Sequence, residues 1–209
     1  MEQGILGPWR DRRVMSFNVP TLERDKTALI VIDMQNDYCK PGGWMDKRGK
    51  NVKPICEMIP RLKWFLEKIR QLGVLVIHVR TIHADYTNSP TWLARYKDVK
   101  PQLCIPNAWG AEMVDELKPL PHEPIVVKHR YSAFINTDLD LILRSKGIKK
   151  LLVTGTATNV CVESTARHGF MLDYLTVTVS DCAASDDGQA HDASLRNLNT
   201  YFGYVADSE

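Results

Sequence analysis

The sequence predicts an α/β protein: a Rossmann-like three-layer sandwich with a mostly parallel six-stranded sheet and helices on both faces. Two observations lead to this fold class. Short apolar runs rich in β-branched residues recur along the chain, and stretches with helical spacing separate them. Strands and helices that alternate in this way form right-handed βαβ units, in which the strands are parallel and the helices cover the sheet.

The predicted strands are continuous apolar runs, which are typical of parallel strands buried on both faces. The first reads TALIVID and the fourth reads KLLVTG. In chain order the six runs span residues 27–33, 74–80, 124–128, 150–155, 175–181 and 204–206.

Four helices are expected between these strands, at residues 55–73, 136–147, 159–168 and 186–203. Gly73 and Gly147 end the first two, because glycine readily adopts the left-handed conformation that closes a helix. Pro60 lies within the first and indicates either a kink or the true start of that helix. Residues 81–124 contain six prolines, so we expect irregular structure with a short helix near 110–118.

Composition excludes several classes of protein. The chain has 209 residues and a net charge of +2, and no long basic stripe indicates a nucleic-acid or membrane partner. No apolar run reaches the ~18 residues of a membrane-spanning helix. The five cysteines are irregularly spaced without a C-x-x-C pair, so neither a zinc ribbon nor a thioredoxin motif is indicated. We expect one cytoplasmic domain over residues 1–209, with 1–20 as a lead-in segment.

Three residues with chemical potential lie where predicted strands end. Asp33 ends the first strand, Lys128 ends the third, and Cys161 begins the helix after the fourth. Singly, each has an ordinary interpretation: a turn aspartate, a solvated lysine and a packed cysteine. In a parallel sheet, however, the carboxyl ends of the strands share one edge, where binding sites form. The sequence therefore predicts that these three side chains lie together.

Such a trio suits nucleophilic catalysis on an amide. A thiol attacks as the thiolate, and both a helix N-terminus and a lysine ammonium favour that anion. Asp33 can accept the thiol proton and later deliver it to a leaving nitrogen. Free N–H groups before the helix can stabilise an oxyanion. The expected reaction is attack on a carbonyl, a thioester intermediate and then hydrolysis.

Three blocks of sequence resemble the isochorismatase-like cysteine hydrolases: IVIDMQNDY, VVKHRYSAFINTDLDLILRSKGI and LLVTGTATNVCVESTARHGF. The resemblance extends from residue 27 to residue 205. It implies that Asp33, Lys128 and Cys161 are catalytic and that no cofactor is used. It further implies a cis peptide between Thr156 and Ala157, an oxyanion hole formed by the N–H groups of Ala157 and Cys161, and a homo-oligomer such as a tetramer.

Within that family the chain most resembles the ureido-amide hydrolases. Biuret or triuret is the expected substrate, and cleavage at C–N releases ammonia. Ureidoacrylate comes second, because the segment between Asp33 and Lys128 is shorter than in enzymes of that type. Nicotinamidases carry an Asp-x-His metal site with further histidines, whereas the comparable region of this chain offers His78 and His83 without an Asp-x-His, so we expect no metal. Isochorismatase activity and an inactive scaffold are further alternatives, although a scaffold has no need of the trio.

Turns beside the trio supply candidate substrate contacts: Asn36, Tyr38 and Asn159. Tyr38 is alternatively a packed turn aromatic, and Asn159 a helix cap. Two further pairs keep two interpretations. Trp92 and Trp109 are expected either to form a lid or to lie between subunits, and Arg130 and Tyr131 either to line the site or to brace a loop or a subunit contact. Glu163 and Arg167 are expected to form an i,i+4 ion pair.

Overall fold

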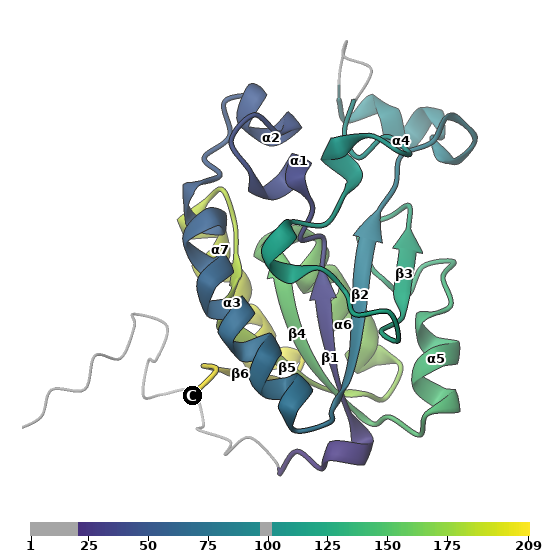
Figure 1. Cartoon of the computed structure of the whole chain (residues 1–209), viewed down its shortest axis with the longest axis vertical. Helices are drawn as coiled ribbons and strands as arrows, with labels where there is room; N and C mark the ends of the chain where they lie inside the picture. The colour runs from purple at the N-terminus through teal and green to yellow at the C-terminus, as the bar shows by residue number, and fades with distance from the viewer. Residues whose placement is uncertain (1–20, 97–101) are drawn as a thin grey trace, which may run out of the picture.

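The computed structural model describes residues 21–96 and 102–209 (Figure 1). The expected lead-in at 1–20 lies outside these residues. All six strands are parallel and lie in the order β3-β2-β1-β4-β5-β6. This confirms the α/β class, with a sheet that is entirely rather than mostly parallel. The strands are β1 Thr27–Ile32, β2 Leu75–Thr81, β3 Ile125–Lys128, β4 Lys150–Thr156, β5 Leu175–Ala184 and β6 Tyr204–Ala206.

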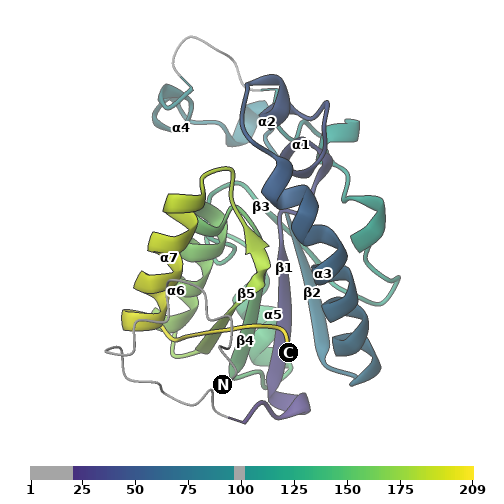
Figure 2. The ribbon, with the colours of Figure 1, turned by 90° about the vertical axis from the view of Figure 1, so that its left-hand side faces the viewer.

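The sheet separates two layers of helices (Figure 2). Alternate residues of β1 show the division: Leu29 and Val31 pack toward helix α3 (Lys53–Gln71), whereas Ile30 and Ile32 pack on the opposite face. That opposite face is covered by α5 (Leu139–Ser145), α6 (Glu163–Met171) and α7 (Gly188–Tyr201). Because both faces are covered, every residue of β1 is buried.

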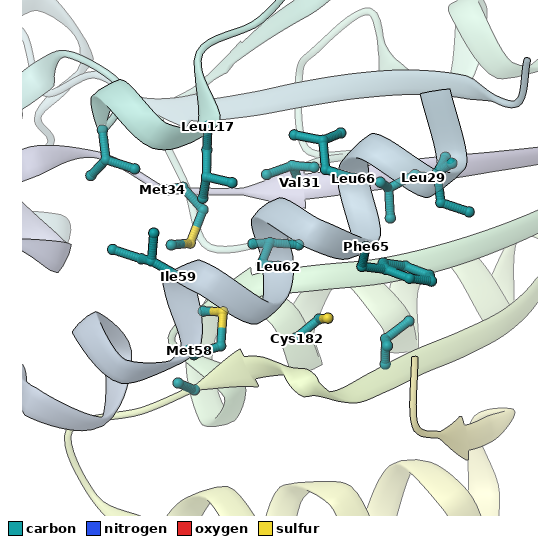
Figure 3. Close-up of a cluster of buried hydrophobic side chains, with 14 of the residues drawn as sticks. Leu29, Val31, Met34, Met58, Ile59, Leu62, Phe65, Leu66, Leu117 and Cys182 are labelled. Atoms are coloured by element: carbon teal, nitrogen blue, oxygen red, sulfur yellow. The ribbon is translucent and has the colours of Figure 1, made fainter. Parts of the chain in front are cut away.

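Helix α3 supplies much of the core on its side of the sheet (Figure 3). Leu62 and Leu66 are one turn apart and fully buried, and they belong to the same cluster as Leu29 and Val31 of β1. Each such leucine contributes about 2–3 kcal/mol through burial. Cys182 of β5 packs in the same cluster as an apolar side chain.

Several local predictions are corrected by the structure. Helix α3 begins at Lys53 and passes through Pro60, which neither starts nor ends it. The lost hydrogen bond is outweighed by the burial of neighbouring side chains such as Met58, Ile59 and Leu62. Helix α5 is shorter than 136–147, because Asn136 has a positive φ of 53° that is incompatible with a helix start there.

The helix predicted at 159–168 has two parts. A π-helical turn, η5 (Thr158–Val162), precedes α6. The single helix expected near 110–118 is replaced by two 3-10 turns, η3 (Trp109–Ala111) and η4 (Asp115–Leu117). The other short elements are η1 Arg24–Lys26, α1 Asn36–Cys39, α2 Trp44–Lys47, η2 Asp85–Thr87 and α4 Pro90–Ala94. A search of the described residues finds no helix with the length and apolarity needed to cross a bilayer.

Candidate active site

The strand order places a topological switch point between β1 and β4. Strands β2 and β3 extend the sheet from β1 in one direction, and β5 and β6 extend it from β4 in the other. Asp33 follows β1, Lys128 ends β3, and Cys161 lies in η5 directly after β4. The three residues are 0%, 1% and 6% exposed, respectively. The residues predicted from strand ends are therefore brought together in a buried position at the carboxyl edge of the sheet.

The Lys128 ammonium lies between the other two members of the trio. Its Nζ is 2.8 Å from Asp33 Oδ2 and 3.4 Å from Cys161 Sγ. Nζ also donates to the backbone oxygen of Arg130 at 3.1 Å. The contact with Asp33 Oδ2 is close, but it lacks the alignment of a hydrogen bond, so it is mainly an ion pair.

Thr81 is a member of the site that sequence reasoning missed. Its hydroxyl donates to Asp33 Oδ1 at 2.9 Å and accepts from Lys128 Nζ at 2.7 Å. Gln35, which is fully buried, fixes the backbone of Thr81 by donating to its carbonyl and accepting from its N–H. Thr81 is the last residue of β2, so the expectation that site residues lie at strand ends applies to it as well. It was missed because the predicted strand ended one residue earlier, at Arg80.

The turns that hold the trio require unusual backbone. Asp33 itself has a φ of 53°. Gly155 has a φ of 110° and lies opposite Ile32 in the β1–β4 pair. A Cβ at Gly155 would come within 2.0 Å of the Ile32 carbonyl oxygen. Only glycine lets β4 approach β1 this closely, just before the chain enters the turn that carries Cys161.

That turn contains a cis peptide bond between Thr156 and Ala157, at the position that the family resemblance implies. The N–H groups of Val160 and Val162 both donate to the Ala157 carbonyl. Ala157 and Cys161 both line the adjacent cavity. The oxyanion hole formed by their N–H groups stays a prediction.

Burial corrects one expectation about Cys161. We expected the helix N-terminus and the lysine to favour a thiolate, but burial is the larger effect and raises the pKa of Cys161 to about 12. The Lys128 ammonium lowers this pKa and the Asp33 carboxylate raises it. Burial also opposes the charged form of Lys128, but the nearby Asp33 and Cys161 outweigh it and raise the lysine pKa. At neutral pH the resting site therefore holds a neutral thiol beside an ammonium.

A cavity of about 270 Å³ opens beside Cys161. Tyr38 and Asn159, two of the three predicted substrate contacts, line it. Asn159 also accepts a hydrogen bond from Ser185 Oγ at 2.6 Å. The third, Asn36, is not among the lining residues, because its amide donates to the Trp109 carbonyl and holds the loop that follows β1. The structure thus gives Asn36 a supporting position rather than a direct one.

The residues left with two interpretations are also resolved in part. Trp92, Arg130 and Tyr131 line the cavity, whereas Trp109 is 51% exposed and does not. Glu163 and Arg167 form the expected i,i+4 ion pair.

His78 is a buried core residue, and its Nε2 lies 2.9 Å from Glu123 Oε2. Burial alone raises the pKa of Glu123, but hydrogen bonds from Arg70, the Leu120 N–H and His78 outweigh it and lower the value to about 2.

His83 lines the cavity, and burial lowers its pKa to about 4, so its imidazole is neutral at physiological pH. Within residues 21–96 and 102–209, no three His, Cys, Asp or Glu side chains lie close enough together to hold a metal ion.

Comparison with known proteins agrees with this architecture. Residues 27–209 match the isochorismatase domain family. The structure of a cysteine hydrolase from Pseudomonas syringae pv. phaseolicola 1448A is 30% identical and superposes with a TM-score of 0.83, covering 93% of this chain and 95% of that chain. N-carbamoylsarcosine amidase from Thermoplasma acidophilum is 25% identical, with a TM-score of 0.71 and coverage of 88% and 97%. A nicotinamidase from Bacillus subtilis is also 25% identical, with a TM-score of 0.74 and coverage of 87% and 99%.

The doubly wound sheet and these similarities define the class of the protein as an isochorismatase-like hydrolase. The chain belongs to the isochorismatase family.

Proposed function

We propose that the protein is a cysteine amidohydrolase that cleaves a C–N bond of a small ureido compound and releases ammonia without a metal. The observation that carries the proposal is the buried Lys128 ammonium in contact with both Asp33 and Cys161. The nucleophile Cys161 and the fixed positive charge of Lys128 line one small cavity, and the proton carrier Asp33 is fully buried and contacts Lys128. The names of two similar structures, an N-carbamoylsarcosine amidase and a nicotinamidase, support amide chemistry.

The proposed reaction has two stages. Asp33 accepts the proton of Cys161, and Sγ attacks the substrate carbonyl carbon. In this proposal the N–H groups of Ala157 and Cys161 stabilise the oxyanion, and the Lys128 ammonium adds positive charge beside Cys161. The C–N bond then breaks as Asp33 returns the proton to the leaving nitrogen, which departs as ammonia.

The second stage regenerates the enzyme. The acyl group on Sγ is a thioester, which for a ureido substrate is an S-carbamoyl cysteine. Asp33 takes a proton from water, the resulting hydroxide attacks the same carbonyl, and the thiol is re-formed with the proton from Asp33. The product is the carbamate, which loses carbon dioxide to leave the free amine.

Biuret, triuret and ureidoacrylate are the ureido substrates that the sequence resemblance proposes. Nicotinamide is a second candidate because the cavity has aromatic walls: Tyr38, Trp92 and Tyr131 line it, and aromatic side chains pack favourably against planar rings. The test is ammonia release by the purified chain from each of these compounds, with Cys161→Ser as the control. Ammonia release from a ureido compound that depends on Cys161 supports the proposal. Turnover of nicotinamide alone would assign the second candidate.

We also propose that the chain forms a homo-oligomer, such as a tetramer, that acts in the cytoplasm. The exposed apolar side chains Leu141, Phe170, Met171 and Tyr201 support association, because they are 44–68% exposed. Light scattering after size exclusion gives the subunit number directly, and a monomer at micromolar concentration would refute the proposal.

A further inference from the structure

The cavity beside Cys161 carries an excess of positive charge. Its charged lining residues are Lys50, Arg95, Lys128, Arg130 and Asp186. Two of the cations are already neutralised, because Lys50 pairs with Asp186 at 2.9 Å and Lys128 pairs with the Asp33 carboxylate. Two guanidinium groups remain, and neither forms an ion pair with any carboxylate among residues 21–96 and 102–209.

Arg130 uses only one nitrogen of its guanidinium group in hydrogen bonds with the described residues. Its Nη1 donates to the carbonyls of Thr87 and His129 at 3.1 and 2.6 Å. These bonds fix the orientation of the group from one side. Within the described part of the chain, no hydrogen bond involves its Nε or Nη2, so one edge of the guanidinium stays available to a ligand.

Arg95 is held by aromatic rings rather than by a counterion. Its guanidinium carbon lies 3.2 Å from the centroid of the Trp92 ring and 4.3 Å from that of Tyr96. Its hydrogen bonds go to the Trp92 carbonyl and the Tyr96 hydroxyl. The guanidinium carbon of Arg130 lies 4.8 Å from the centroid of the same Trp92 ring, so both guanidinium groups contact one aromatic side chain of the cavity wall.

Both guanidinium groups line the cavity without a carboxylate partner among the described residues. An anionic ligand would supply the missing counter-charge. A guanidinium edge matches the two oxygens of a carboxylate, with which it forms paired, charge-assisted hydrogen bonds. Uncharged biuret offers no such group and would leave both cations unmatched.

We propose that Arg95 and Arg130 bind a carboxylate of the substrate, and that the enzyme therefore acts on ureido acids of the N-carbamoyl amino acid class in preference to biuret or triuret. This inference rests on the proposed amidohydrolase function and specifies its substrate. For N-carbamoylglycine, Sγ would attack the carbamoyl carbon, ammonia would leave, and water would release N-carboxyglycine. That carbamate then decomposes to glycine and carbon dioxide, so the atoms balance without any co-reactant.

The experiment compares N-carbamoylglycine with its methyl ester, which has the same ureido group without the charge, and with biuret. Ammonia release gives kcat/KM for each compound with the wild type and with Arg95→Gln and Arg130→Gln. Arg144→Gln is the matched control, because Arg144 is an exposed arginine of α5 that pairs with Asp140 and does not line the cavity. Thermal melting of each variant verifies that it is folded.

We expect the wild type to prefer the acid over the ester by at least about tenfold, because charge-assisted hydrogen bonds from the two guanidinium groups to a carboxylate are lost with the ester. Each cavity variant should lower this preference by about tenfold or more, mainly through KM, whereas the control should keep it. Equal use of acid and ester by the wild type would overturn the inference and leave the amidohydrolase intact. Equal losses on all three compounds would also overturn it, because they would show a purely structural role. If no ureido compound releases ammonia, the proposed function itself fails.

Discussion

Replacement of Thr81 by valine tests whether this hydroxyl positions the catalytic pair. The change preserves the shape and strand preference of the side chain and removes only the hydroxyl. Two interactions are lost: the 2.9 Å bond to Asp33 Oδ1 and the 2.7 Å bond from Lys128 Nζ. Asp33 and Lys128 are both almost completely buried, so water does not readily replace the missing partner.

The expected cost follows from these contacts. A hydrogen bond to a charged group contributes about 1.5–3 kcal/mol, and leaving a buried charge without its aligned partner costs a similar amount. Asp33 depends on Thr81 in particular, because its contact with Lys128 is poorly aligned as a hydrogen bond. A loss of that size in the transition state lowers kcat by about 10- to 100-fold.

The assay is steady-state ammonia release with the best ureido substrate, together with urea unfolding. We expect Thr81→Val to lower kcat with little change in KM, and to lower the free energy of unfolding by about 1–3 kcal/mol. Thr81→Ser keeps the hydroxyl and should retain most of the activity. Wild-type kcat in the valine variant, or an equal loss in the serine variant, would refute the positioning role.

Further predictions concern the nucleophile, the backbone, acid stability and metal. Cys161→Ser should lower activity by about 10³-fold or more without changing the melting temperature greatly, whereas alanine at any other cysteine should affect mainly stability. Gly155→Ala should lower the free energy of unfolding by about 3 kcal/mol or more because its Cβ meets a β1 carbonyl, whereas Gly188→Ala, which has open space, should be nearly neutral. The pKa of Glu123 falls from 4.5 to about 2 on folding, so its stabilisation is complete above pH 4.5 and disappears toward pH 2. Glu123→Gln should therefore flatten the loss of stability between these pH values in urea titrations. Prolonged chelation should leave activity unchanged, and recovery with added zinc, manganese or iron would contradict the metal-free mechanism.

The sheet was predictable because its signal is local. Runs such as TALIVID are apolar on both faces, and this pattern is typical of strands in a sheet that helices cover on both sides. Asp33 and Lys128 could then be found from the rule that parallel strands end at a shared edge. Helix boundaries were less predictable. Helix α3 continues through Pro60, because burial of its apolar face outweighs the loss of the hydrogen bond that proline cannot form.

The remaining parts of the site depend on contacts between distant segments. Thr81 is a single polar residue at the end of an apolar run, and only its distances to Asp33 and Lys128 distinguish it from an ordinary strand residue. Arg95 lies in a proline-rich segment without periodicity. Its proposed role depends on the other cations of the cavity, Lys50 and Lys128, which are already paired with carboxylates.

The protonation state of Cys161 could not be derived from residue types either, since burial and charge act in opposite directions. Lys128 lies 2.8 Å from the Asp33 carboxylate, so much of its field at Sγ is cancelled, and burial then keeps the thiol neutral. Transfer of the proton from Cys161 to Asp33 converts an aspartate–lysine pair into a thiolate–lysine pair. The net charge of the buried site is the same before and after. Activation of the thiol therefore needs no additional charge to be desolvated, which allows a nucleophile this deeply buried to react when a carbonyl group is beside it.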